Sequence, residues 1–379
     1  MNFNLTKTQE LFRQMIREFA EKEVKPLAAE IDEQERFPAE TVEKMAKLGI
    51  FGIPVPTQYG GAGGDNLMYS IAVEELSRAC ATTGVVVSAH TSLCMAPIME
   101  HGTEEQKMKY LPKLASGEWI GAFGLTEPNA GTDAAGQQTT AVLDGDEWVL
   151  NGNKIFITNA GPAHVYIVIA MTDKSMKTKG ISAFIVEKGT PGFEIGKKEL
   201  KMGIRGSATA ELIFNNCRIP KDNLLGKIGG GFPIAMKTLD GGRIGIASQA
   251  LGIAQAALDE TVKYTKERKQ FGKAIGQFQN TQFQMADLKT RVEAARLLVR
   301  SAAFKKDSGV PYSADAAMAK LFAAETAMEV TTKAVQFHGG YGYTREYPVE
   351  SMMRDAKITE IYEGTSEVQR MVISANLYK

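Results

Sequence analysis

The hydrophobic pattern of this 379-residue chain changes its period twice. Up to about residue 120, and again beyond residue 229, apolar side chains recur every three to four positions. Between them lie short β-rich runs separated by Gly, Asn and Asp. A helical period cannot serve as a strand period, so the pattern limits where each class of element can form. The sequence predicts an α+β fold: a helical domain at 1–120, an antiparallel β-barrel or sandwich domain at 121–228, and a helical bundle at 229–379.

The first part begins with a helix signal. Thr6 and Gln9 form a capping-box pattern, and apolar residues then repeat on one face from Phe12 to Phe19. Residues 71–76 and 106–114 have the same amphipathic character. We therefore expect several packed helices before the β-rich region.

The middle part has the alternation and turn residues of strands. The predicted strands are Gln138–Leu143, Trp148–Leu150, Ile155–Ile157, Val165–Met171, Ile181–Val186 and Glu211–Phe214. Asp144-Gly145 predicts a hairpin turn, and Asn151-Gly152 predicts a second turn. Because no strand–GxGxxG–helix unit occurs, a Rossmann domain is disfavoured.

The last part has two long apolar seams that indicate a helical bundle. One runs through Met285, Leu288, Val292, Ala295, Val299 and Ala302, and the other through Ala317, Leu321, Ala324, Met328, Thr331 and Val335. Alanine in such seams lets helices approach closely.

Composition excludes some functions. Lysine plus arginine equals aspartate plus glutamate at 44 each, so no net field favours nucleic acid. The three cysteines form no disulfide pattern, and the four histidines lack metal-ligand spacing, so we expect a reduced setting and no metal. No run approaches the roughly 18 apolar residues of a membrane span, and we expect no membrane association. The N-terminus reads as neither signal nor transit peptide, which fits a prokaryotic cytoplasm or a processed mitochondrial form.

Glu363 is the candidate base. It stands directly before Gly364, with Thr365 and Ser366 placed to cap a following helix. Such a carboxylate, desolvated by apolar neighbours, would have its pKa raised towards that of a useful general base. An exposed glutamate in a turn between two helices is the alternative.

The segment Phe123–Thr132, FGLTEPNAGT, is a second candidate. Hydroxyls and main-chain donors at 125–127, with Gly131 and Thr132, suit a polar heterocycle and a pyrophosphate. On the bare sequence alone, a surface turn is the favoured interpretation.

IYEGTSEVQ near the C-terminus, HGGYGYTREYPVE before it and FGLTEPNAGTD together resemble the acyl-CoA dehydrogenases. The resemblance runs from about residue 5 to the end and is strongest to the short-chain, butyryl-CoA type. It implies an α–β–α chain with a C-terminal four-helix bundle, FAD as cofactor, and Glu363 as catalytic base.

The resemblance also implies the cofactor contacts. They are Phe123, Leu125, Thr126, Glu127, Gly131, Thr132, Phe156, Ile157, Thr158, Arg268, Phe271, Gln279, Gln336, Gly339, Gly340, Thr365, Ser366 and Glu367. Arg268, Gln279 and Gln336 map to contacts with the FAD of a neighbouring subunit, which implies a homotetramer. Phe156 stands where many members of the family carry tryptophan.

For the acyl-CoA, the implied contacts are Thr132, Asp240, Gly241, Gly242, Arg243 and Gly364. Some members of the family place their base directly before this arginine. Here that residue is Gly242, which has no side chain, so the base is expected at Glu363.

The resemblance therefore implies a short-chain acyl-CoA dehydrogenase that forms a trans-2-enoyl-CoA and passes electrons to an electron transfer flavoprotein. An enoyl-CoA reductase in an electron-bifurcating complex would need the same residues and stays open. An acyl-CoA oxidase is disfavoured, because oxidases resemble longer chains. A flavin-free scaffold is the alternative from another class, and the intact Glu363, Arg268, Thr158 and Arg243 argue against it.

Overall fold

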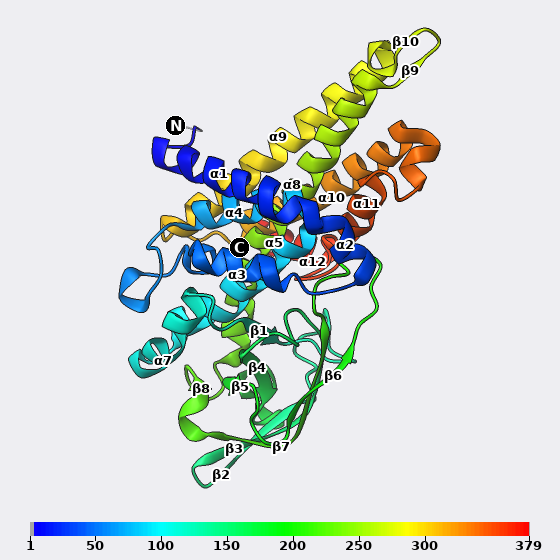
Figure 1. Cartoon of the computed structure of the whole chain (residues 1–379). Coiled ribbons are helices and arrows are strands. Elements are labelled where there is room, and N and C mark those ends of the chain that lie inside the picture. Colours follow the sequence, from blue (N-terminus) through cyan, green and yellow to red (C-terminus); the bar gives the residue numbers. More distant parts are fainter. Residues whose placement is uncertain (1–3, 379) are drawn as a thin grey trace.

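The computed structural model describes residues 4–378 and has helices at both ends of the chain with a β-sheet between them (Figure 1). The α-helices are α1 (Lys7–Phe19), α2 (Ala28–Gln34), α3 (Ala39–Lys47), α4 (Asn66–Ala79), α5 (Ala81–Ser88), α6 (Ala96–His101), α7 (Glu104–Ala115), α8 (Gly231–Glu267), α9 (Gln279–Asp307), α10 (Ser313–His338), α11 (Val349–Ile358) and α12 (Ser366–Leu377). The α–β–α order predicted from the sequence is confirmed. The exact limits 1–120, 121–228 and 229–379 stay a proposal for the domains.

The strands form one large sheet and one small hairpin. They are β1 (Gly121–Gly124), β2 (Thr140–Asp144), β3 (Glu147–Ile157), β4 (Val165–Met171), β5 (Ile181–Glu187), β6 (Phe193–Lys198), β7 (Ala210–Pro220), β8 (Leu224–Leu225), β9 (Lys269–Gln270) and β10 (Lys273–Ala274). The sheet order is β6-β7-β3-β2-β4-β5-β8, and β1 pairs with β4. The β9–β10 hairpin lies at the end of the molecule opposite the large sheet (Figure 1).

Besides the strands β6 and β8, which were not predicted, two features of the sheet differ from the prediction. The expected turn at Asn151-Gly152 lies inside the single strand β3, whose register with β7 shifts between Leu150 and Gly152. Gly152 has φ 140°, and such a bulge lets a strand bend without ending. The second difference is β1, which runs parallel to β4 although the sheet is mostly antiparallel. Its four residues were too few to give a strand signal.

The C-terminal helices pack around a core rich in alanine. The predicted seam of α9 is confirmed for Leu288, Val292, Ala295, Val299 and Ala302, which are all buried. Of the predicted seam of α10, Ala317, Ala324 and Thr331 are buried, Met328 and Val335 are partly buried against the core, and Leu321 is partly buried. The buried surface of α10 also includes Ala316, Lys320, Ala323, Ala327, Val330 and Ala334. Spacings of four and three recur along both sets, which are displaced by one residue, or about 100° around the helix.

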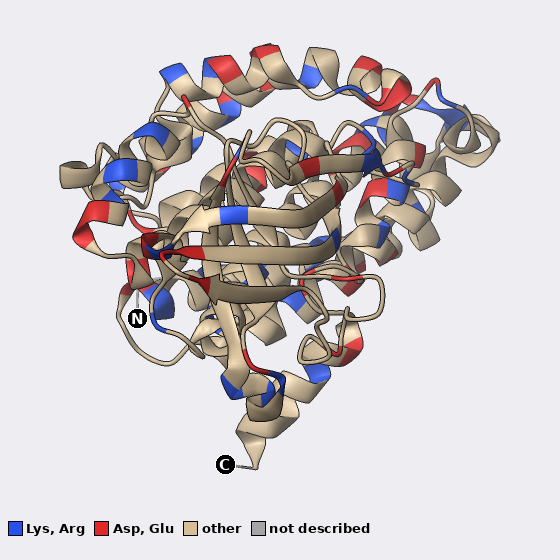
Figure 2. Cartoon of the chain, turned by 90° about the horizontal axis from the view of Figure 1, so that it is seen from below, with Lys and Arg blue, Asp and Glu red and all other residues tan. Residues whose placement is uncertain are grey.

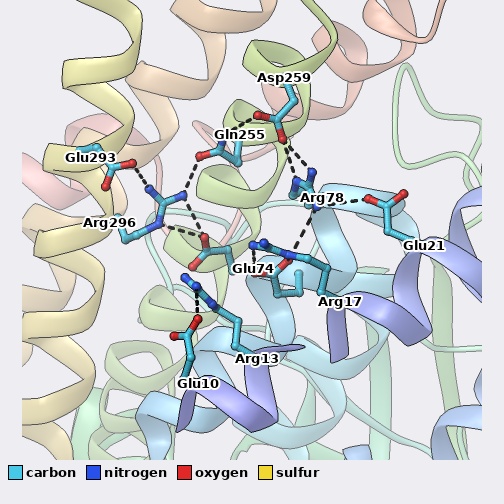
Figure 3. A network of polar contacts seen from close by, with 11 residues as sticks. Glu10, Arg13, Arg17, Glu21, Glu74, Arg78, Gln255, Asp259, Glu293 and Arg296 are labelled. Carbon is cyan, nitrogen blue, oxygen red and sulfur yellow. Dashed lines mark hydrogen bonds and ion pairs between the residues drawn. The ribbon is translucent and has the colours of Figure 1, made fainter. Parts of the chain in front are cut away.

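Charged contacts fix the N-terminal helices on the bundle (Figure 3). Arg17 of α1 donates two hydrogen bonds to the buried carboxylate of Glu75 on α4. Arg296 of α9 donates a hydrogen bond to Glu74, which is also on α4, and its Nε lies 3.1 Å from the carboxylate. Bidentate and multiply bonded arginine pairs hold both position and orientation. Helix α4 also contacts α8, where the hydroxyl groups of Ser70 and Ser248 share a 2.7 Å hydrogen bond.

One continuous helical segment, Ala81–His101, is long and apolar enough to cross a membrane by length and composition. It joins α5 and α6 through a π-helical stretch at Ala89–Met95. The sequence analysis expected no such segment. Because 94% of its most apolar window is buried inside the structure, it has the character of a core helix.

Acidic and basic residues are mixed along the outer helices, and the strands at the centre of the view carry few charges (Figure 2). This distribution agrees with the equal numbers of cationic and anionic residues.

Candidate active site

Glu363 lies in the short turn between α11 and α12. Its φ is 54°, and that of Gly364 is 92°, so two successive residues are left-handed. Thr365 then caps α12 by accepting a hydrogen bond from the amide of Val368 at 3.3 Å, which confirms the predicted cap. A left-handed non-glycine residue costs roughly 1–3 kcal/mol, so surrounding contacts must hold Glu363 in this conformation.

Two side chains from neighbouring helices hold the turn. The Nε2 of Gln369 on α12 donates to the Gly364 carbonyl at 2.8 Å and to the Glu363 carbonyl at 3.3 Å. The Nζ of Lys320 on α10 donates to the Gly364 carbonyl at 2.7 Å. The backbone on both sides of the left-handed turn is therefore fixed from α10 and α12.

The carboxylate of Glu363 faces α8. Its Oε2 is fully buried and has no hydrogen-bond partner within residues 4–378. A Cβ placed on Gly242 would overlap with this oxygen and would lie 2.8 Å from Cδ2 of Leu93. The missing side chain at Gly242 is therefore what leaves room for the carboxylate.

Burial raises the pKa of Glu363 to about 7, and the positive charges of Lys320 and Arg243 oppose this rise. This confirms the upward shift expected from the sequence. A general base works best when its pKa lies near the working pH.

Asp240 and Arg243 lie one helical turn apart on α8 and form an ion pair. Asp240 also accepts a hydrogen bond from Ser313 at 2.8 Å, while the Nε of Arg243 is buried without a partner in the described chain. Asp240 borders a cavity of about 550 Å³ whose other walls include Tyr69 and Tyr312. Of the predicted substrate contacts on α8, Asp240 is thus the one that borders this cavity.

Gln249 lies about two turns beyond Gly242 on α8. It is fully buried, donates to the carbonyl of Ala81 at 3.1 Å and accepts a hydrogen bond from Tyr362. These contacts join α8 to the start of α5 and to the turn before α12. Nothing in the sequence analysis had predicted this residue.

The segment after β1 is tied to the end of β3. The amide of Ile155 donates to the carbonyl of Thr126 at 2.9 Å. The fully buried Lys154 donates to the carbonyl of Leu125 at 3.0 Å, the carboxylate of Glu127 at 2.7 Å and the side chain of Gln137 at 3.0 Å. All three donors of the ammonium group are satisfied, so the segment is held as one rigid piece.

Glu127 is occupied within the chain. Its carboxylate accepts hydrogen bonds from the amides of Gln138 at 2.6 Å and Thr139 at 3.0 Å, and its own amide donates to Ala130 at 3.1 Å. Its expected contact with FAD therefore stays a prediction. In such a contact the carboxylate of Glu127 would already be paired within the chain.

Next to this segment, Phe156 carries a large aromatic ring to the surface. Its φ is 58°, and the residue is 60% exposed. Thr158 is half-buried, and Gly131 and Thr132 are exposed. An exposed aromatic ring on a strained backbone, beside an open glycine, suits a flat ligand that covers the ring.

The two groups of residues lie close together. Leu93 packs in the same core cluster as Phe123 and Leu125. The same leucine side chain lies beside Gly242, opposite Glu363. The candidate base and the candidate flavin segment therefore border one region of the molecule.

Comparison with known proteins identifies this arrangement. The chain matches three domain models described as the N-terminal, middle and C-terminal domains of acyl-CoA dehydrogenase, over residues 6–118, 122–217 and 229–378. The chain belongs to the acyl-CoA dehydrogenase family. A short-chain specific acyl-CoA dehydrogenase of Clostridium acetobutylicum is 65% identical over 379 residues, covering all of both chains.

Solved structures agree with this assignment. The butyryl-CoA dehydrogenase of Megasphaera elsdenii is 54% identical with a TM-score of 0.98, and the match covers all of both chains. A structure reported for the electron transferring flavoprotein of Acidaminococcus fermentans, in work on flavin-based electron bifurcation, contains a chain that is 58% identical. That match has a TM-score of 0.99 and also covers all of both chains.

Other residues that the family resemblance singled out lie at the far end of α8. Arg268, Gln336, Gly339 and Gly340 line a second cavity of about 500 Å³. About 25 residues separate Arg243 from Arg268, which places them about 38 Å apart along the helix at 1.5 Å per residue. These residues of the acyl-CoA dehydrogenase chain are therefore not brought together with its own Glu363.

Near this second cavity, Phe271 is 93% exposed at the tip of the β9–β10 hairpin, and Gln279 is exposed at the start of α9. His338 is the last residue of α10. Its Nδ1 lies 2.7 Å from the Ala334 carbonyl, but its Nε2 is buried without a partner among residues 4–378.

The predicted contacts on α12 have different surroundings. Ser366 is buried and its hydroxyl has no partner in the described part of the chain, whereas Glu367 is exposed in the first turn. Their contacts with FAD stay predictions.

Proposed function

We propose that this chain is an FAD-dependent short-chain acyl-CoA dehydrogenase. It removes one hydrogen from Cα and one from Cβ of a short acyl-CoA and forms a trans-2-enoyl-CoA. The observation that carries this proposal is the buried, unpartnered carboxylate oxygen of Glu363 opposite the side-chain-free Gly242.

The residues present fit FAD. The open backbone at Gly131, Gly339 and Gly340, where an added Cβ would meet nothing within 4 Å, allows close approach of a phosphate or a ring. Arg268 is exposed and suits a phosphate because its guanidinium stays charged and binds in a fork. Bound FAD supplies the acceptor for the hydride that leaves Cβ.

Glu363 would take the α-proton on its buried oxygen. The electron pair of the broken Cα–H bond forms the C=C bond as the β-hydrogen leaves with its own pair. An α-proton of a thioester is weakly acidic, so charge that develops on the carbonyl oxygen must be stabilised. Within the described residues the amide of Glu363 donates to no acceptor, which leaves it available to the thioester carbonyl.

We propose that Gln249 and Tyr362, held by their mutual hydrogen bond, limit the length of the acyl chain that fits beside Glu363. A longer chain would have to displace the buried amide and leave its partners without hydrogen bonds, which costs about 1–3 kcal/mol per group.

We therefore expect kcat/KM for butyryl-CoA to exceed that for octanoyl-CoA. Gln249→Ala, which removes the blocking amide, should raise the octanoyl-to-butyryl ratio about tenfold. Anaerobic titration of the flavin with C4 to C8 acyl-CoAs measures both. Tyr362→Phe is the matched control, because it breaks the hydrogen bond but keeps the ring. A wild-type preference for octanoyl-CoA would contradict the short-chain assignment.

A second candidate is the reverse reaction. The 58% identity to a chain in a structure from work on electron bifurcation favours an enoyl-CoA reductase fed by an electron transfer flavoprotein. Glu363 would then return the proton to Cα. Rates of flavin reduction by butyryl-CoA and of reoxidation by crotonyl-CoA, each with and without electron transfer flavoprotein, distinguish the two directions. A purified protein without flavin absorption would instead favour the scaffold alternative.

We further propose a homotetramer in which Arg268 and Gln336 contact the FAD of a neighbouring subunit. The distance of about 38 Å along α8 between Arg268 and Arg243 supports this, since one cofactor beside Glu363 does not reach that far in the same chain. We also propose an electron transfer flavoprotein as redox partner and a cytoplasmic location.

Arg268→Ala should weaken FAD binding about tenfold or more, because a charge-assisted hydrogen bond to phosphate contributes about 1.5–3 kcal/mol. FAD retention after gel filtration and the mass by sedimentation measure the effect. Arg218→Ala is the control, since Arg218 is an exposed arginine on β7 paired with Asp144 and Glu147. A fully flavin-loaded, active monomer would overturn the proposed assembly.

A further inference from the structure

Lys320 is a buried cation that the reaction described above does not use. It lies on α10 in the seam formed by Ala316, Ala323 and Ala327, and it is fully buried. A methionine would fill the same space without the cost of desolvating an ammonium group, which amounts to several kcal/mol. A lysine in this position needs a reason beyond packing.

The side chain ends at the turn that carries the base. Lys320 Nζ donates to the carbonyl of Gly364 at 2.7 Å, directly after Glu363. No carboxylate among residues 4–378 forms a salt bridge with it. The other cation near the base, Arg243, is already paired with Asp240. Lys320 is thus the cation beside Glu363 that has no salt bridge in the described chain.

The charged and titratable groups around this pair come from three helices and the turn. Arg243 lies on α8 and Tyr69 on α4. Tyr362 and Glu360 lie in the turn, and Glu367 lies in the first turn of α12. Burial lowers the pKa of Lys320 to about 8, and the negative charge of Glu363 opposes this. The two groups therefore stabilise each other's charged forms.

We propose that Lys320 is a positioning residue for Glu363. Its ammonium group holds the Gly364 carbonyl, and with it the left-handed turn, and it keeps a positive charge beside the carboxylate inside the water-excluded site. The geometric effect aims the carboxylate at Gly242. The electrostatic effect keeps the base ionised at neutral pH although it is buried. The inference rests on the proposed role of Glu363 as base.

Two variants separate these effects. Lys320→Gln keeps a donor for the Gly364 carbonyl but removes the charge, and Lys320→Met removes both. Flavin reduction by butyryl-CoA is followed in single turnovers from pH 5.5 to 9.5. In Lys320→Gln the rise of the rate with pH should move to higher pH, so that at pH 6 the rate is about tenfold below wild type. The difference in rate between Lys320→Gln and wild type should narrow above pH 8, because Lys320 of the wild type loses its own charge there.

Lys320→Met should show the same displacement of the pH profile and, in addition, a lower rate on the plateau. Gln369→Leu is the matched control, because Gln369 bonds to the same carbonyl without carrying a charge. It should lower the plateau and leave the position of the rise unchanged. If Lys320→Gln and Lys320→Met lowered the rate equally at every pH, Lys320 would have only a structural role and the proposal would be wrong.

A reciprocal measurement needs no change at Lys320 and covers the case in which its variants fail to fold. Nitrogen-15 NMR of labelled lysine side chains should reveal a lysine that titrates well below the ordinary range and moves lower still in Glu363→Gln, which lacks the counter-charge. If no lysine signal responds to Glu363→Gln, the coupling is absent and the proposal falls. If Glu363→Gln keeps normal activity, the proposed base itself is wrong, which is a separate outcome.

Discussion

Glu363→Gln is expected to slow flavin reduction by butyryl-CoA by about 10²–10⁴-fold, the usual contribution of a general base. The amide has the shape of the carboxyl group and can still hydrogen-bond, so the fold, FAD binding and acyl-CoA binding should persist. The position opposite the carboxylate is Gly242, which has no side chain to substitute as a base. Single-turnover reduction monitored by flavin bleaching gives the rate directly.

The pH dependence provides a further readout of the same group. Glu363 must be ionised to accept the α-proton, and burial raises its pKa to about 7. The wild-type kcat/KM should therefore rise as pH increases through about 7 and level off above it. The residual activity of Glu363→Gln should lack this rise.

Glu360→Gln is the matched control for this experiment. Glu360 lies three residues before Glu363 in the same turn and pairs with Lys357 at 2.7 Å. Because this carboxylate is already paired, its replacement should leave the rate within about twofold of wild type. Reduction of Glu363→Gln at nearly the wild-type rate would show that another group removes the proton.

The sequence was sufficient to predict the order of the elements and the position of the base. The helical and β-rich periods differ strongly enough that α4, α9 and the strands β2, β3, β4, β5 and β7 fell where they were expected. Glu363 could be singled out because Gly364 and Thr365 predict a turn followed by a capped helix, and the structure has both. These features depend on residues close in sequence.

The supporting residues could not be found in this way. Lys320 is separated from Gly364 by more than forty positions, and Lys154 is similarly remote from Leu125. One signal was nevertheless present. Lys320 is the lysine in the four-three repeat through Ala316 and Ala334, and a lysine on such an apolar seam indicates a buried charge. The predicted seam ran one position further along the helix, through Ala317 and Ala324, so Lys320 was not singled out.

Gln249 was missed for a different reason. A glutamine in a long helix is compatible with burial or exposure, and only the positions of Ala81 and Tyr362 decide between them. The proposed limit on acyl-chain length thus depends on contacts among three segments: α5, α8 and the turn before α12. Local patterns carry no information about such contacts.

The geometry around Gly242 allows the base to be moved. A Cβ on Gly242 would point at the carboxylate oxygen of Glu363, so a glutamate at 242 would bring its own carboxyl group into the space that the side chain at 363 occupies. Removing the side chain of Glu363 also relieves backbone strain at that position. Glycine at 363 adopts the observed φ of 54° without strain. Replacing glycine by glutamate inside α8 also improves helix propensity by roughly 0.5–1 kcal/mol.

Glu363→Gly alone should therefore lose about 10²–10⁴-fold in the rate of flavin reduction. Adding Gly242→Glu should raise the rate of flavin reduction again by at least about tenfold. The Cδ2 of Leu93, 2.8 Å from the new Cβ, must move slightly to admit the new side chain.

The control is Glu363→Gly combined with Gly242→Gln, which has the same shape but no base. Gly242→Glu alone should be impaired, since two carboxylates in contact cannot both be ionised and the pKa of one is forced upward. Activity should recover only in Glu363→Gly combined with Gly242→Glu, in protein that retains FAD. That result would show that the reaction requires a carboxylate at this point in space, whichever backbone position carries it. Equal rates in the glutamate and glutamine double variants would contradict that conclusion.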